Sequence, residues 1–125
     1  MNNLKDRDLD AIVHAYLVCA LWASTAEDGT PVDDLADTDD VNAETRKSAR
    51  DDCEDFLKLC DREGVSLKGW DDAQIGHDFW LTRNHHGAGF WDRGRGEVGE
   101  RATKLAHTFS ERYVFVGDDG AVYIE

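Results

Sequence analysis

The segment GHDFWLTRNHHGAGFWDRGRG, Gly76–Gly96, differs in composition from the rest of the chain, and the fold of the C-terminal half depends on it. It holds three histidines, four Trp and Phe residues, three arginines and five glycines. Asp71 and Asp72 can cap a helix that runs into this segment and continues to about Asn84. The glycines that follow are typical of a loop. We call residues 76–96 the motif segment, and we predict a helix end followed by a structured loop.

On both sides of the motif segment, apolar residues recur at helical spacing in three further stretches. They predict a first helix from about Asp6 to Thr25, a second from Asp40 or Asn42 to Gly64, and a last one from Glu97 to Arg112. Residues 26–40 break the pattern with glycine, the single proline and a run of aspartates, which indicates an acidic loop with one short turn at Val32–Ala36. Gly76 within the third helix costs about 1 kcal/mol relative to alanine, which indicates a close packing contact there.

The last thirteen residues change to a strand period. YVFVGDDGAVYIE, residues 113–125, predicts two short strands joined at Asp118-Asp119-Gly120. An isolated hairpin is marginally stable in water, so this one must pack on the helices. The predicted fold class is therefore α+β: a single domain over residues 1–125, with about four helices and a C-terminal β-hairpin packed on them.

Composition limits the protein class. The chain has 125 residues, of which 41% are hydrophobic and 33% charged, as in a soluble globular domain. Its longest apolar run falls short of the roughly 20 residues of a membrane span, and its acidic start does not fit a signal peptide. We therefore expect a cytoplasmic protein that does not contact membranes. Cys19, Cys53 and Cys60 lack zinc-type spacing, which favours buried reduced thiols.

The charge is strongly negative and unevenly distributed. The net charge is −13; residues 24–72 hold sixteen acidic and six basic residues, and residues 73–125 hold eight and six. Such a chain does not suit duplex DNA, whose binding relies on Lys and Arg. The second helix is predicted to carry an acidic face formed by Asp51, Asp52, Glu54 and Asp55. This face can attract basic proteins, imitate a phosphate array, or simply keep the protein soluble.

The motif segment does not fit a known catalytic or metal-binding pattern. Its histidines lack the i, i+4 pairing of helical metal sites, and no nucleophile or phosphate-loop signature is present, so we assign no catalytic residue, metal or cofactor. Its aromatic and arginine side chains suit contacts with a partner or stacking on bases. Phe79 and Phe90 are expected in the core. The predicted interaction residues are Trp80, Arg83, Asn84, His86, Trp91, Asp92 and Arg93.

The same residues carry a family resemblance. Asn84 and the run from His86 to Arg93, HGAGFWDR, resemble the signature of a family of small proteins encoded in bacteriophage genomes. His85 departs from that signature, because the family often has glycine there. The resemblance covers residues 76–96 well and continues weakly to the C-terminal hairpin. It implies a small accessory protein made inside an infected bacterium, and it implies no particular activity.

Two functions follow as expectations. The first is a non-enzymatic phage-type protein that binds and modulates a host or phage protein, such as a defence or DNA-processing factor. It would bind through the acidic surface of residues 27–63, which includes the face on the second helix, or through the loop at residues 84–95, with nucleic-acid mimicry as one mode. The alternative is a protein or small enzyme that binds nucleotides or single-stranded nucleic acid through His77, His86, Asp92 and Arg93. A self-assembling component is a third possibility, and the sequence does not indicate the oligomeric state.

Overall fold

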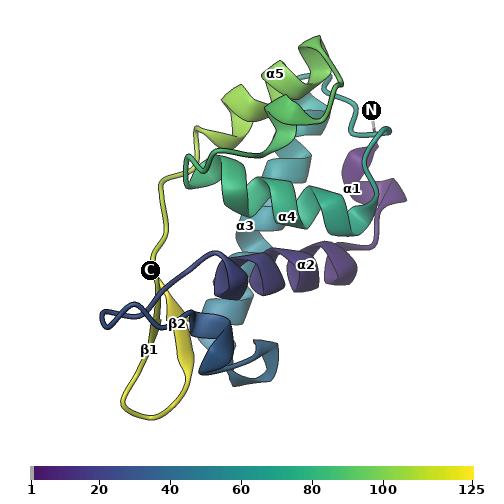
Figure 1. The fold of residues 1–125 in the computed structure, drawn as a ribbon. Coiled ribbons are helices and arrows are strands. Elements are labelled where there is room, and N and C mark those ends of the chain that lie inside the picture. The colour runs from purple at the N-terminus through teal and green to yellow at the C-terminus, as the bar shows by residue number, and fades with distance from the viewer. Residues whose placement is uncertain (1) are drawn as a thin grey trace.

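The computed structural model describes residues 2–125, which form one α+β domain, as predicted (Figure 1). Within these residues, a very short helix precedes four longer ones, and two strands close the chain. The elements are α1 (Asn3–Asp6), α2 (Leu9–Trp22), α3 (Ala43–Arg62), α4 (Asp72–Arg83), α5 (Glu97–Ala106), β1 (Val114–Val116) and β2 (Val122–Ile124), with 3-10 turns η1 (Val32–Asp34), η2 (Thr38–Asp40) and η3 (Phe90–Asp92).

Helices α2 and α4 lie side by side and form the most extensive contact between any two elements (Figure 1). Gly76 makes this approach possible, as predicted. A Cβ atom on Gly76 would overlap the backbone oxygen of Ile12 and lie 2.8 Å from the backbone nitrogen of Tyr16. The backbones of the two helices therefore touch at this point, and only a residue without a side chain fits there.

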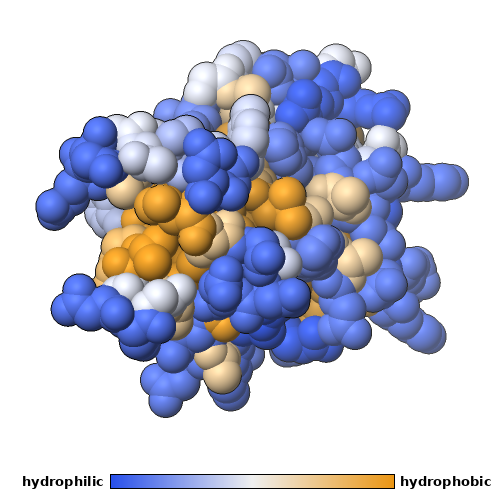
Figure 2. All heavy atoms as spheres, turned by 60° about the horizontal axis from the view of Figure 1, so that its bottom comes forward, coloured by the Kyte–Doolittle hydropathy of each residue, from blue (hydrophilic) through white to orange (hydrophobic). Residues whose placement is uncertain are grey.

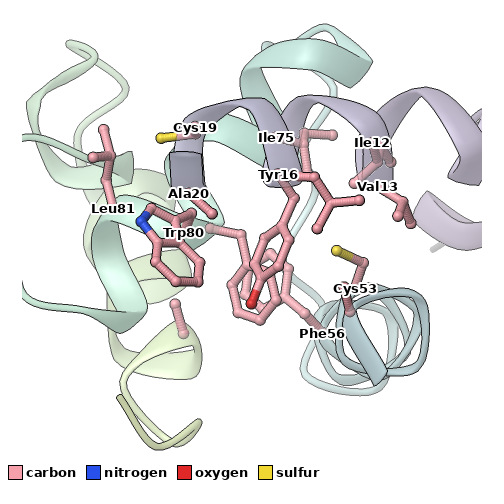
Figure 3. Close-up of a cluster of buried hydrophobic side chains, with 14 of the residues drawn as sticks. Ile12, Val13, Tyr16, Cys19, Ala20, Cys53, Phe56, Ile75, Trp80 and Leu81 are labelled. Atoms are coloured by element: carbon pink, nitrogen blue, oxygen red, sulfur yellow. The ribbon is translucent and has the colours of Figure 1, made fainter. Parts of the chain in front are cut away.

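The core lies where α2, α3 and α4 meet (Figure 3). The ring of Phe56 stacks on Phe79 with centroids 4.5 Å apart and on Phe90 at 5.3 Å, and Tyr16 meets Trp80 edge-on at 5.3 Å. Phe79 and Phe90 are fully buried, as predicted. Such aromatic pairs add to the stabilisation that their buried apolar area provides.

The three cysteines are buried and unpaired, which confirms the interpretation of the sequence. Burial raises the pKa of the Cys19 and Cys60 thiols to about 12, and it raises the pKa of Cys53 as well. The thiolate form, which is the reactive one, is therefore strongly disfavoured in the folded protein. All three residues act as small apolar side chains.

The N-terminal half differs from the prediction in two details. The first helix is divided, because the Asp8 side chain caps α2 by accepting a hydrogen bond from the Ala11 backbone, so that α1 is separate. Asn3 of α1 is buried and donates to the Val65 backbone oxygen at 2.7 Å. Residues 26–40 contain two 3-10 turns in place of one, and Asp37 caps the second. Helix α3 begins after its Asn42 cap, as predicted.

The last helix is shorter than predicted, because tertiary hydrogen bonds replace helical ones after Ala106. The Ser110 backbone oxygen accepts two hydrogen bonds from Arg83, at 2.7 and 3.0 Å. The Arg112 backbone nitrogen donates to the Asn84 side chain at 2.8 Å. Phe109 packs edge-on against Phe79, 5.1 Å between centroids. The side chain of Arg83 thus holds residues 107–112 outside a helix.

The hairpin packs on the helical body through β2. Val114, Phe115 and Val116 pair antiparallel with Ile124, Tyr123 and Val122. On its other side β2 meets the start of α3, where the Asn42 backbone nitrogen donates to the Val122 oxygen at 2.9 Å. Strand β1 is therefore the outer strand of the pair.

Replacing Gly76 with alanine should destabilise the protein, although alanine is the better helix former. The gain of about 1 kcal/mol in helix propensity is outweighed by a clash with backbone atoms, and we expect a net loss of about 2 kcal/mol or more. The free energy of unfolding in urea measures it. Gly87→Ala is the matched control, since a Cβ atom there meets nothing within 4 Å. Equal stability of the two variants would contradict the close approach.

Candidate functional site

The motif segment is organised around a buried carboxylate. The side chain of Asp78 on α4 is 0% exposed and accepts hydrogen bonds from three residues. Trp70 Nε1 donates at 3.0 Å and Gln74 Nε2 at 3.1 Å. Arg93 donates through Nη2 at 2.6 Å and through Nε at 3.0 Å. A charge removed from water is tolerated only when it is paired and hydrogen-bonded, and Asp78 meets both conditions.

Arg93 ties the glycine-rich loop to α4. Its hydrogen bonds to Asp78 raise the pKa of the Arg93 guanidinium, which therefore stays charged. Beside it, Asp92 Oδ1 accepts from the Gly89 backbone nitrogen at 3.1 Å. The side chain of Phe90, at the start of η3, is fully buried and attaches this turn to the core. The loop is thus a fixed structure, as the sequence predicted.

A second buried charge lies at the other end of α4. Arg83 is 1% exposed, and its Nη1 donates to Asp52 Oδ2 at 2.7 Å and to the Tyr16 hydroxyl at 3.1 Å. Its guanidinium also lies over the rings of Phe79 and Phe109, 5.4 and 5.5 Å from their centroids. Burial raises the pKa of the Tyr16 hydroxyl, which stays protonated beside the arginine. Arg83 links α2, α3, α4 and the segment after α5.

Three predicted interaction residues are therefore structural. Trp80 is 2% exposed and Arg83 is 1% exposed, so neither side chain reaches a partner in solvent. Their burial follows from the position of α4, which other elements cover along most of its length. The side chain of Asn84 donates to the Trp80 backbone oxygen at 2.9 Å and accepts from Arg112, which fixes the end of α4.

The other predicted interaction residues reach the surface. Trp91 is 50% exposed and His86 is also exposed, whereas the side chains of Asp92 and Arg93 are each 31% exposed. The backbone at His85 is left-handed, with φ of 56°. The His85 backbone nitrogen donates to the Thr82 oxygen, and the His86 backbone nitrogen donates to the Leu81 oxygen. These two hydrogen bonds are those of a Schellman motif at the end of a helix. Glycine would adopt that conformation without strain.

The predicted acidic face on α3 is a mosaic of both charges. Asp51 pairs with Lys47 at 3.1 Å and Glu54 with Lys58 at 2.9 Å, one helical turn away. Asp52 is engaged by the buried Arg83. Residues 26–40 differ from α3, because they hold seven acidic residues and neither lysine nor arginine.

The structure places three of the four residues of the alternative ligand site in two separate hollows, and Asp92 lines neither of them. His77 and Arg93 line a hollow of about 590 Å³ between α2 and α4, together with His14. His86 lines a different hollow beside Trp80 and Tyr113. Within residues 2–125, no three His, Cys, Asp or Glu side chains are arranged to hold a metal ion.

The fold and site thus define a small α+β domain with a rigid surface loop. No protein-family model matches the chain, and neither a curated protein nor a solved structure shows significant similarity to it. None of the helices in residues 2–125 is long and apolar enough to cross a membrane.

Replacing Asp78 with asparagine should cost about 2–4 kcal/mol, because it leaves the guanidinium of Arg93 and the indole of Trp70 without a charged acceptor. Urea unfolding followed by circular dichroism measures the loss. Asp92→Asn is the control, since that carboxylate is partly exposed and accepts one backbone hydrogen bond; we expect about 1 kcal/mol or less there. A smaller effect at position 78 than at position 92 would show that the buried pair does not hold the loop.

Proposed function

We propose that the chain is a non-enzymatic accessory protein of a bacteriophage type, which binds another protein in the cytoplasm of an infected bacterium and modulates it. The observation that carries the proposal is the presentation of Trp91. Its indole is 50% exposed on η3, between the buried Phe90 and the loop residues that Asp78 fixes.

A rigid exposed tryptophan is suited to binding. Tryptophan is enriched among the residues that contribute most to protein interfaces, because it buries a large area with few rotatable bonds. The ion pair beneath the loop holds η3 in place before a partner arrives, which lowers the entropic cost of association. Trp91 would provide the contact with the partner. The proposed setting, an infected bacterium, comes from the resemblance to phage proteins.

The net charge of −13 favours a basic partner. Host defence and DNA-processing factors present basic surfaces to nucleic acid, and an acidic protein can occupy such a surface. Because α3 carries both charges, nucleic-acid mimicry would rest on residues 26–40 rather than on the predicted helix face. Elution of a captured partner by added DNA tests this mode.

Replacing Trp91 with alanine should abolish capture of the partner and leave the fold intact. Tagged wild-type and variant proteins are incubated with bacterial lysate, and retained proteins are quantified by mass spectrometry. Loss of a central interface tryptophan costs about 2 kcal/mol or more, which is about thirtyfold in affinity.

The matched control is Trp22→Ala, because Trp22 is 61% exposed on another part of the surface, at the end of α2. A partner retained by the wild type and the Trp22 variant, and lost with the Trp91 variant, supports the proposal. Failure of all three proteins to retain anything specific, or equal retention by all three, would count against it.

Nucleotide binding is the second candidate, and the hollow between α2 and α4 favours it. Arg93 and His77 line this hollow, and the indole of Trp22 lies against the His77 ring, 5.9 Å between centroids. Aromatic rings of this kind are suited to stacking on a nucleotide base. Adenosine phosphates should raise the thermal unfolding temperature of the wild type and of His86→Ala, and fail to raise that of His77→Ala. An unchanged unfolding temperature of the wild type would remove this candidate.

A further inference from the structure

A second surface, separate from Trp91, follows the outer edge of β1. Two hollows lie along it: one of about 720 Å³ beside β1, η1 and residues 25–28, and one of about 240 Å³ between residues 24–25 and residues 111–114. Both are lined by Thr25 and Val114, so together they form one groove, which we call the β1 groove. Figure 2 shows apolar surface gathered on this side of the molecule and bordered by hydrophilic residues.

The edge of β1 that faces away from β2 offers unused backbone groups. Tyr113 exchanges hydrogen bonds with Glu125, and the Gly117 nitrogen donates to Ala121, so the residues paired through hydrogen bonds are 113, 115 and 117. In an antiparallel pair, the intervening residues direct N–H and C=O outward. These residues are Val114 and Val116, and no group in residues 2–125 hydrogen-bonds to their outward backbone atoms. An open edge of this kind is a template for another strand.

A buried donor without an acceptor lies at the same groove. The indole nitrogen of Trp80 is inaccessible and has no hydrogen-bond partner in residues 2–125. Trp80 lines the smaller hollow beside Tyr113 and Val114. Buried polar groups are nearly always paired, so this indole N–H, beside the groove, is an exception that the surrounding elements of the fold leave unsatisfied.

The larger hollow of the groove has apolar and acidic walls, whereas both Glu111 and Arg112 line the smaller one. Val32, Leu35 and Val116 supply the apolar lining, and the charged residues of the larger hollow are Glu27, Asp28 and Asp118, with no base among them. A hydrogen bond from the Thr30 backbone lowers the pKa of Asp28. One from the Tyr123 hydroxyl lowers the pKa of Asp119, at the hairpin tip. Asp28 and Asp119 therefore keep their negative charge to a lower pH than an unperturbed aspartate does.

We propose that the β1 groove binds an extended basic segment of another protein, which adds to the sheet as a strand beside β1. Its backbone pairs with Val114 and Val116, alternate apolar side chains contact the exposed Leu35 and the partly exposed Val116, and its Lys and Arg side chains meet Glu27 and Asp118. Backbone pairing supplies affinity, and the side chains supply specificity, as in other strand-addition complexes. A second copy of this chain is disfavoured as the occupant, because its own acidic rim would be repelled.

Fluorescence anisotropy with labelled peptides of about seven residues, the length of an ordinary strand, tests the proposal. The probes alternate Lys or Arg with Val, Ile or Leu, and a matched set replaces Lys and Arg by Glu. We expect the basic set to bind and the acidic set not to bind. Glu27→Lys combined with Asp118→Lys should weaken binding by about tenfold or more at low ionic strength. Asp55→Lys combined with Glu63→Lys changes the net charge equally, away from the groove, and should have little effect.

Two N-methylated versions of the best-binding peptide separate strand pairing from charge attraction and leave the protein unaltered. Only one set of alternate peptide N–H groups faces β1, so methylation of that set should abolish binding and methylation of the other should not. Amide signals of Val114 and Val116 and the Trp80 indole signal, identified with Trp80→Phe, should shift on binding. Absence of binding, equal binding of the methylated versions, shifts elsewhere, or a dimer through β1 in sedimentation would each overturn the proposal. None of these outcomes depends on Trp91.

Discussion

Helix α4 carries a carboxylate and a guanidinium into the interior, and the rest of the structure is arranged to neutralise them. An unpaired charge in such a position costs several kcal/mol. Asp78 therefore requires a cation, and Arg93 brings the glycine-rich loop back over the helix to provide it. Arg83 requires an anion and neutral acceptors. Asp52 on α3 and the Ser110 backbone meet that need, which places α3 and ends α5 early. Two buried charges on one helix thus set the positions of three other segments.

The sequence predicted the helices and the hairpin because their signals are local. The Asn42 cap, the strand period of residues 113–125 and the helix that contains Gly76 each depend on residues within a few positions. The burial of Arg83 depends on Asp52, 31 residues away, and on Ser110, 27 residues away. From sequence alone an arginine is expected at the surface, and the burial of Arg83 becomes evident only from the packing of α4. Asp78 gave a weak signal, since an acid between apolar residues of a buried helix must have a partner.

The mixture of histidine, aromatic and arginine residues in the motif segment looked like a ligand site, and most of it builds the interior. Trp80, Arg83 and Asn84 close α4 against its neighbours, and Asp92 fixes a turn. Trp91 and His86 remain exposed, and Asp92 and Arg93 are partly exposed. The motif is therefore best understood as a framework that holds a short loop in place.

The acidic segment is ordered chiefly by its own backbone, and the one cation in residues 2–125 that bonds to it, Arg46, contacts the Thr38 backbone oxygen rather than a carboxylate. The carboxylates of Asp28, Asp37 and Asp40 accept hydrogen bonds from nearby backbone N–H groups, which hold the turns between α2 and α3 in place. Such hydrogen bonds stabilise the ionised carboxylate and leave its charge uncompensated. On α3, by contrast, lysines neutralise the acids within one turn. Negative potential consequently concentrates where the segment borders β1, beside backbone groups that no other strand covers. The outer edge of β1, which no strand in residues 2–125 covers, thus borders Glu27, Asp28 and Asp118, so it repels acidic chains and favours basic ones.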